Sequence, residues 1–278
     1  MKGLGQLFFD GANSDGISKC SMLGETVLGV LHAEHVQAVL NASSYVVPIP
    51  IYQKHLDMFL GRRSILSLMG DEWRIVRKVM ARAFNRDYLR EMVGDMCRVT
   101  NAFLKALEGR HGQVLDFWPL MKCITLDVIG QTGFGYDFNC AATLTPSPVA
   151  LSFEFLLEEL TERPNSALDP RVYFYSWPSA RNRKHAACNA TIRATLASLI
   201  ARRQQERRDP ALVGEEHRDM LKYMLDAHEE DDASVTDSET LVDNLMTILF
   251  AGYDTSSITL TYVRSCGSHS LLTCLISL

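Results

Sequence analysis

Five consecutive residues near the end of the chain, Ala251-Gly252-Tyr253-Asp254-Thr255, combine residue types that could do chemistry. They interrupt an apolar helical segment, where glycine costs about 1 kcal/mol relative to alanine, so Gly252 needs a reason. Two small residues in succession leave room for something bulky and flat to lie against the helix. Thr255 is four residues after Ala251, so its hydroxyl can bond the Ala251 carbonyl and open a local kink. Together with the Asp254 carboxylate, such a groove could hold a small ligand and relay protons to it.

The same five residues also fit a purely structural arrangement. Small residues allow two helices to cross closely, and Asp254 could then pair with an arginine elsewhere in the chain. Taken alone, the segment is explained at least as well in this way. A buried carboxylate and hydroxyl are costly without partners, however, and this keeps the functional interpretation open.

A second pair of residues, Trp73 and Arg77, is spaced so that both side chains lie on one face of a helix. An indole N–H and a guanidinium that point the same way suit an anionic carboxylate or phosphate. The alternative is a tryptophan packed in the core beside a surface arginine, and this is the better explanation of the pair taken alone.

The elements that must position these residues are mostly helices. Apolar residues recur at three- and four-residue steps from Gly70 to about Arg110, with a break near residues 85–86. The sequence further predicts helices over residues 33–41, 114–130, 150–162 and 180–208, and a weak strand over 24–31. It also predicts a proline-bearing loop between the 33–41 helix and Gly70, and a second loop over 141–149. The segment from 241 to 263 is apolar nearly all round, which predicts a central buried helix, and Thr236 to Glu239 resemble a capping box at its start.

Composition narrows the function without identifying it. With 47% apolar and 22% charged residues among 278, the chain has the balance of a globular protein, and its net charge of −5 argues against general nucleic-acid binding. Seven cysteines without metal-ligand spacing indicate a reducing compartment. No stretch approaches the ~20 apolar residues of a membrane span, so we expect no membrane segment and no signal peptide.

Four segments in order resemble the cytochrome P450 superfamily over about residues 24–263. GRRSILSLMGDEWRIVRKVMARAFNRDYL is similar to the family's C-helix region with its WxxxR motif, and TLDVIGQTGFGYDF is similar to its E helix. DMLKYMLDA, the acidic loop and TDSETLVDNL resemble the run-up to the I helix, and FAGYDTS resembles the oxygen-binding motif of that helix. The resemblance implies a mainly α, partial cytochrome P450 fold, with a short N-terminal strand region and helices B to I.

The resemblance also implies roles for the residues singled out above. Trp73 and Arg77 would hydrogen-bond a haem propionate. The distal face of the haem would be lined by Ala251 and Gly252, and protons would reach the oxygen site through Asp254 and Thr255, while Phe250 would face the substrate pocket. The implied cofactor is haem b, and the implied partners are O2, a small lipophilic substrate and an electron-donating reductase. Family members are often bound to endoplasmic-reticulum or organelle membranes, which leaves the location of this chain open.

Three later features of the family do not occur in the sequence: the K-helix ExxR, the meander segment and the FxxGxRxCxG loop whose cysteine ligates iron. The ExxR at Glu215–Arg218 precedes the I-helix motif, and Cys266, eleven residues after Thr255, is too close to it to reach the opposite face of the same haem. We therefore expect residues 1–263 to be the N-terminal portion of one cytochrome P450 domain and residues 264–278 to be an unrelated tail.

Two functional hypotheses follow from these observations. In the first, the chain is by family a haem-thiolate monooxygenase, although this polypeptide is not competent by itself. In the second, it is a non-catalytic helical fragment or pseudoenzyme with at most a partner-binding role. Both predict that the face of the 241–263 helix normally covered by the later helices is exposed and apolar.

Overall fold

The computed structural model describes residues 11–22, 25–41, 50–82, 84, 86–165, 174–208, 219–230 and 237–267. The chain divides into two compact units, Met1–Ile49 and Pro50–Leu278. In the first unit, strands β1 (Ile17–Met22) and β2 (Glu25–Val30) pair antiparallel, with Ile17 opposite Val30, and helix α2 spans Ala33–Asn41. The strand and helix predicted here are confirmed, whereas β1 was not predicted because its apolar residues do not alternate regularly.

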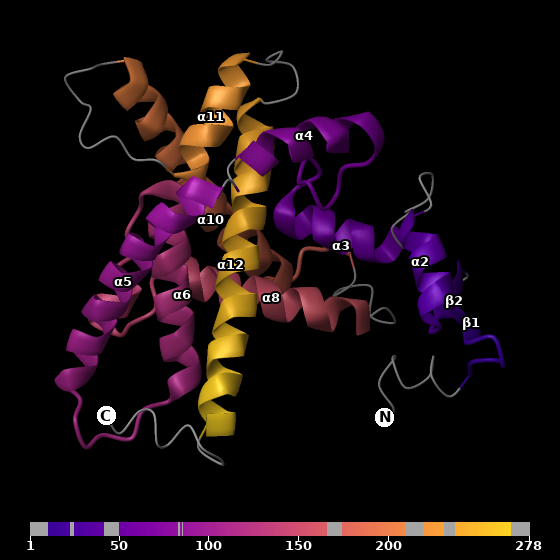
Figure 1. The fold of residues 1–278 in the computed structure, drawn as a ribbon, viewed down its shortest axis with the longest axis horizontal. Coiled ribbons are helices and arrows are strands. Elements are labelled where there is room, and N and C mark those ends of the chain that lie inside the picture. The colour runs from indigo at the N-terminus through magenta and orange to yellow at the C-terminus, as the bar shows by residue number, and fades with distance from the viewer. Residues whose placement is uncertain are drawn as a thin grey trace. The chain divides into compact units, whose positions relative to one another are not determined.

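The regular elements described in the second unit are all helices (Figure 1). Its helices are α3 (Pro50–Leu60), α4 (Gly70–Arg82), α5 (Arg86–Glu108), α6 (Phe117–Phe134), α7 (Cys140–Thr143), α8 (Pro148–Asn165), α10 (Ala180–Arg208), α11 (Met220–Glu230) and α12 (Ser238–Gly267). The predicted mainly α class is confirmed, as are the helix over 180–208 and the break between α4 and α5.

Three details of the predicted elements are wrong. The proline-bearing stretch after α2 contains α3, because Pro50 occupies the first helical position, where its missing N–H costs nothing. The predicted loop over 141–149 contains most of α7 and the start of α8. Helix α6 begins later and ends later than predicted: Asp116 caps it by accepting from the Trp118 N–H at 3.1 Å, and Gly135 ends it at φ 59°.

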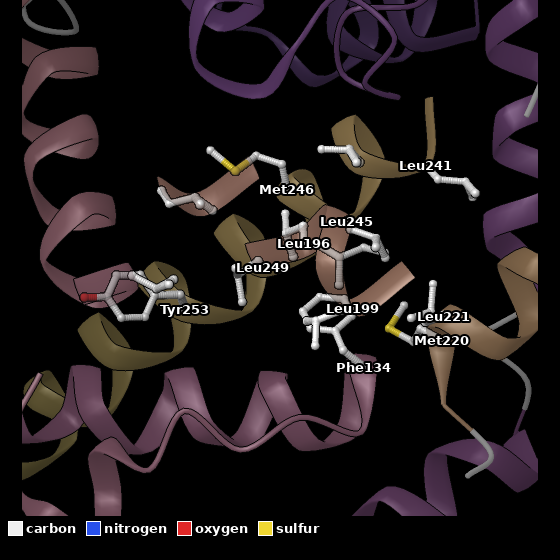
Figure 2. Close-up of a cluster of buried hydrophobic side chains, with 14 of the residues drawn as sticks. Phe134, Leu196, Leu199, Met220, Leu221, Leu241, Leu245, Met246, Leu249 and Tyr253 are labelled. Atoms are coloured by element: carbon white, nitrogen blue, oxygen red, sulfur yellow. The ribbon is translucent and has the colours of Figure 1, made fainter. Parts of the chain in front are cut away.

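The core of the second unit is built around α12, beside which α6 runs (Figure 1). Figure 2 shows apolar side chains from α6, α10, α11 and α12 meeting in one cluster. Fully buried members include Leu196 of α10, Leu221 of α11 and Leu245 of α12. The first half of α12 is therefore a central buried helix, as its sequence predicts.

Two polar features fix the ends of these helices. At the start of α12, the Asp237 carboxylate accepts from the Thr240 N–H at 3.0 Å and from the Thr240 hydroxyl at 2.6 Å. Asp237 is therefore the cap; Thr236, the predicted cap, lies outside the described residues. At the end of α10, Arg203 forms an ion pair with Asp219, which precedes α11, at 2.7 Å. Among the described residues, no helix is long and apolar enough to cross a membrane.

Candidate functional site

The loop that leads into α4 is held by polar side chains of α12. The carboxylate of Asp243 accepts from the Arg63 N–H at 3.0 Å, and Asn244 accepts from the Ile65 N–H at 2.9 Å. The Asn244 amide also donates to the Arg63 carbonyl at 3.0 Å. Each of these buried polar groups gains a partner that it would otherwise lack, so the loop and α12 hold each other in register.

Further contacts tighten the same junction. The hydroxyls of Ser64 and Thr247 lie 2.8 Å apart and are buried, and Arg193 of α10 forms an ion pair with Asp243. Gly61 has φ +100°, and a Cβ on it would overlap the Asp243 carboxylate, so only glycine fits there. Burial outweighs the nearby cations and raises the pKa of Asp243. The sequence interpretation missed these residues, although an adjacent Asp and Asn in an apolar helix are a visible sign of buried polar anchoring.

Helix α4 presents Trp73 and Arg77 to solvent. Its buried positions are Val76, Val79 and Met80, whereas Trp73 is 40% exposed and Arg77 is also exposed. Arg74 on the same helix pairs with Asp71 at 2.6 Å, but Arg77 has no ion-pair partner within the described part of the chain. The alternative of a core tryptophan is therefore wrong, and the guanidinium of Arg77 is available to an anion.

The motif on α12 shows the local hydrogen bond that its spacing predicts. The Thr255 hydroxyl donates to the Ala251 carbonyl at 2.6 Å, and the Thr259 hydroxyl repeats the pattern on the Thr255 carbonyl at 2.9 Å. Ala251, Thr255 and Thr259 are all exposed, so one face of α12 presents small residues and hydroxyls. The helix is continuous through this region.

The space next to Gly252 is taken by α6. A Cβ added to Gly252 would come within 2.8 Å of the Ile129 Cγ1 and Cδ1 atoms, which is closer than side chains tolerate. The structural alternative, a close helix crossing, therefore accounts for Gly252. The neighbouring Ala251 lies on the exposed face, and a flat ligand could approach there without displacing α6.

Asp254 is half-buried between these two faces. Burial raises the pKa of its carboxyl group, and the positive charge of Lys122 on α6 acts in the opposite direction. No arginine pairs with Asp254 among the described residues. The charge that acts on its pKa is that of Lys122, a residue that the sequence interpretation did not single out. A carboxyl group with a raised pKa holds its proton to higher pH, which suits proton donation.

Phe250 precedes the motif and points toward α3. Its ring contacts that of Phe59 edge-on, with 5.2 Å between centroids, and Phe59 in turn contacts Phe153 of α8. Phe250 is only partly buried, so one side of the ring belongs to the core. Among the described residues, no hydrogen bond or ion pair joins this α12 segment to Trp73 or Arg77. Helices α4 and α12 are linked instead through the loop before α4, which Asp243 and Asn244 hold.

The cysteines that the structure describes do not provide an evident iron ligand. Cys97 is exposed on α5, and Cys188 is partly buried on α10. Cys123 and Cys140 are buried together. The hydrogen bond between them, together with burial, raises the pKa of the Cys123 thiol. The side chain of Cys266 and all of Cys274 lie outside the described residues, as do Glu215–Arg218 and residues 268–278. Within the described ranges, no cluster of His, Cys, Asp and Glu could hold a metal ion.

Comparisons with known proteins place this arrangement in a family. Cytochrome P450 94A2 of Vicia sativa is 29% identical over 239 residues, covering 82% of this chain and 44% of the relative. LUTEIN DEFICIENT 5, chloroplastic, of Arabidopsis thaliana is 29% identical over 74% of this chain and 35% of its own length. An ultra-long-chain fatty acid omega-hydroxylase of Homo sapiens is 24% identical over 83% of this chain and 44% of its own length. The chain thus spans less than half the length of these relatives.

Structural comparison gives the same result for the fold. The crystal structure of a cytochrome P450 (CYP102L1) superposes with a TM-score of 0.66 at 21% sequence identity, covering 90% of this chain and 55% of the other. The family description for cytochrome P450 matches residues 12–263, a range that includes both the α4 pair and the α12 motif. The chain belongs to the cytochrome P450 family.

Proposed function

We propose that this chain supplies the propionate-binding and proton-delivering part of a haem-thiolate monooxygenase. The observation that carries the proposal is the hydrogen bond from Thr255 to the Ala251 carbonyl on the exposed face of α12, directly beside the half-buried Asp254. An oriented hydroxyl next to a carboxyl group with a raised pKa can pass protons toward a reacting group on that face. Family membership supports the assignment for the complete protein.

The residues present fit two parts of a haem site. The guanidinium of Arg77 has no ion-pair partner among the described residues, and with the indole of Trp73 on the same face of α4 it suits a propionate carboxylate. The open face around Ala251 suits the flat side of a porphyrin, which we propose to be haem b. The described cysteines do not fit the third part, the thiolate ligand, so no step that depends on iron ligation is assigned to them. When bound, haem would supply the redox chemistry that activates O2.

The substrate and partners follow from the same proposal. The name of the human relative, an ultra-long-chain fatty acid omega-hydroxylase, supports a lipophilic organic substrate. The free edge of Phe250 is apolar and lies one residue before the small-residue face, where such a substrate would approach. We propose O2 and an electron-donating reductase as the other partners. Two relatives named as chloroplastic make an organelle one candidate location.

Haem titration into the 278-residue chain tests the proposal. Binding is followed by the Soret absorbance, and the reduced, CO-bound spectrum then reports whether a thiolate ligates the iron. Arg77→Ala should weaken haem binding about tenfold or more, because a hydrogen bond to a charged group contributes roughly 1.5–3 kcal/mol. Arg74→Ala is the matched control, since Arg74 is on the same helix but pairs with Asp71.

Each outcome decides between the two hypotheses for this chain. Haem binding that depends on Arg77 supports the proposed site, and a thiolate-type band would show in addition that the chain provides its own iron ligand. Haem uptake that Arg77→Ala and Arg74→Ala leave equally unchanged would contradict the propionate site. Absence of haem uptake would favour the non-catalytic fragment.

A further inference from the structure

Lys122 of α6 is unusual because its charged side chain is almost fully enclosed. The residue is only 9% exposed, and its Nζ donates to the Glu154 Oε1 on α8 at 2.7 Å. The same Nζ lies 4.9 Å from the centroid of the Trp118 ring. An enclosed ammonium group needs compensating negative charge, so the groups around it are in electrostatic contact.

The packing of α6 on α12 brings Lys122 close enough to Asp254 for its charge to act on the pKa of that carboxyl group. From the end of α6 toward its start, the paired positions are Gly133 with Ile248, Ile129 with Gly252, and Thr125 with Tyr253, whose carbonyl accepts from the Thr125 hydroxyl at 3.0 Å. The two helices therefore run antiparallel at this contact. The next turn of α6 carries Lys122, and the next residue of α12 is Asp254, so the crossing itself brings the two charges together.

Three further titratable side chains face this position: that of Glu154, which pairs with Lys122, and those of Tyr253 and Cys123. Glu154 is about half exposed, with a side chain 51% accessible to solvent. The Tyr253 hydroxyl and the Cys123 thiol are buried here. Burial raises the pKa of Tyr253, and the hydrogen bond with Cys140, followed by burial, raises the pKa of Cys123. Both groups are neutral near pH 7. The ammonium group of Lys122 is therefore paired with Glu154 and also acts electrostatically on Asp254.

We propose that Lys122 is a positioning residue for Asp254, and that Glu154 modulates it by sharing the lysine at the surface of α8. In this arrangement the ammonium group favours the ionised form of Asp254, while the ion pair with Glu154 weakens that effect. The inference rests on the proposed function, because Asp254 is the proposed proton donor. The electrostatic effect of Lys122 on Asp254, however, does not require haem. Residues from three helices, α6, α8 and α12, would then set how readily Asp254 takes up and releases its proton.

Carbon-13 NMR of the haem-free, full 278-residue chain, labelled in its aspartate carboxyl carbons, tests this inference. Asp254→Asn assigns the signal, and its pH titration is compared in four backgrounds: the unchanged chain, Lys122→Met, Glu154→Gln and the double variant. Lys184→Met is the matched control, because Lys184 on α10 also lies over an aromatic ring, that of Phe155, at 4.2 Å. Circular dichroism checks that each variant retains its helices.

The expected shifts have opposite signs. Lys122→Met should raise the titration midpoint of Asp254, Glu154→Gln should lower it, and Glu154→Gln should have no effect once Lys122 is absent. Lys184→Met should leave the midpoint unchanged. An unchanged midpoint in a folded Lys122→Met variant overturns the inference. If that variant does not fold, Glu154→Gln decides: a lower midpoint supports shared positioning, and an unchanged or higher midpoint rejects it. Failure of haem binding would contradict the proposed function and leave these shifts intact.

Discussion

The two halves of α12 belong to one continuous helix but lie in different surroundings. Every residue from Thr240 to Leu249 is buried, whereas from Ala251 to Val263 only Tyr253 and Ser257 are. The first half packs against α10, α11 and the loop before α4; the second contacts α6 along one side (Figures 1 and 2). The first half therefore stabilises the fold, while the second half presents the candidate site.

Truncation of matched leucines in the two halves should give the largest contrast. Leu245 is fully buried, so Leu245→Ala should lower the free energy of unfolding by about 3 to 4 kcal/mol, through lost burial and a residual cavity. Leu260 is 41% exposed, and Leu260→Ala should cost less than about 1 kcal/mol. Urea denaturation followed by circular dichroism measures both. Equal losses at the two positions would show that the second half is also covered in solution.

The close crossing of α6 and α12 gives the next largest effect. Gly252→Ala should destabilise the chain by about 1–2 kcal/mol, because the new methyl group overlaps Ile129 and the core resists the added volume. Gly94 on α5 has nothing within 4 Å of an added Cβ, so Gly94→Ala should instead stabilise by about 0.5–1 kcal/mol.

The penalty at Gly252 depends on its neighbour Ile129. In an Ile129→Ala background the obstruction is absent, and Gly252→Ala should lose most of its penalty. A double-mutant cycle in urea measures this coupling. If the two substitutions are additive, the crossing is not what requires glycine at this position.

Asp237, which caps the first half of α12, and Asp254, in the second half, should contribute to stability with opposite dependence on pH. The hydrogen bond from the Thr240 hydroxyl, together with the Thr240 N–H and Arg63, lowers the pKa of Asp237 to about 2. The folded chain then binds fewer protons than the unfolded chain, so this stabilisation is complete above the ordinary aspartate pKa and is lost as the pH falls toward 2. Burial raises the pKa of Asp254, so its contribution is present at low pH and is lost as the pH rises through the folded pKa.

Single substitutions separate these two contributions. Asp237→Ala should cost about 1 kcal/mol at neutral pH, the usual value of a lost N-cap, and should flatten the acid limb of stability. Asp254→Asn should be neutral or slightly stabilising at pH 7 and should not flatten that limb. Thermal melts between pH 2 and pH 7 provide the measurement. An acid limb unchanged by Asp237→Ala would contradict the capping role.

The sequence predicted the local features of both halves and missed those that depend on distant residues. The bond from Thr255 to Ala251 spans one helical turn, so spacing alone anticipates it. The Ile129 contact and the influence of Lys122 arise only when α6 and α12 meet, and no local pattern identifies which helix lies opposite Gly252. The same applies to Asp243, whose partners lie in the loop before α4 and in α10. Apolar periodicity likewise predicts a buried helix without showing how much of it is covered.

The smallest expected change in stability concerns the exposed apolar end of α12, where Tyr262 is 67% and Val263 is 52% exposed. Tyr262→Gln should alter the unfolding free energy by no more than about 0.5 kcal/mol, because little contact is lost. It should, however, reduce self-association in sedimentation velocity, since an exposed apolar surface is an aggregation liability. Leu151→Gln on α8 is the matched control, an exposed leucine outside this face. A large loss of stability with unchanged association would mean that the end of α12 is packed within the chain, and the contrast between the two halves would then be confined to residues near Ala251.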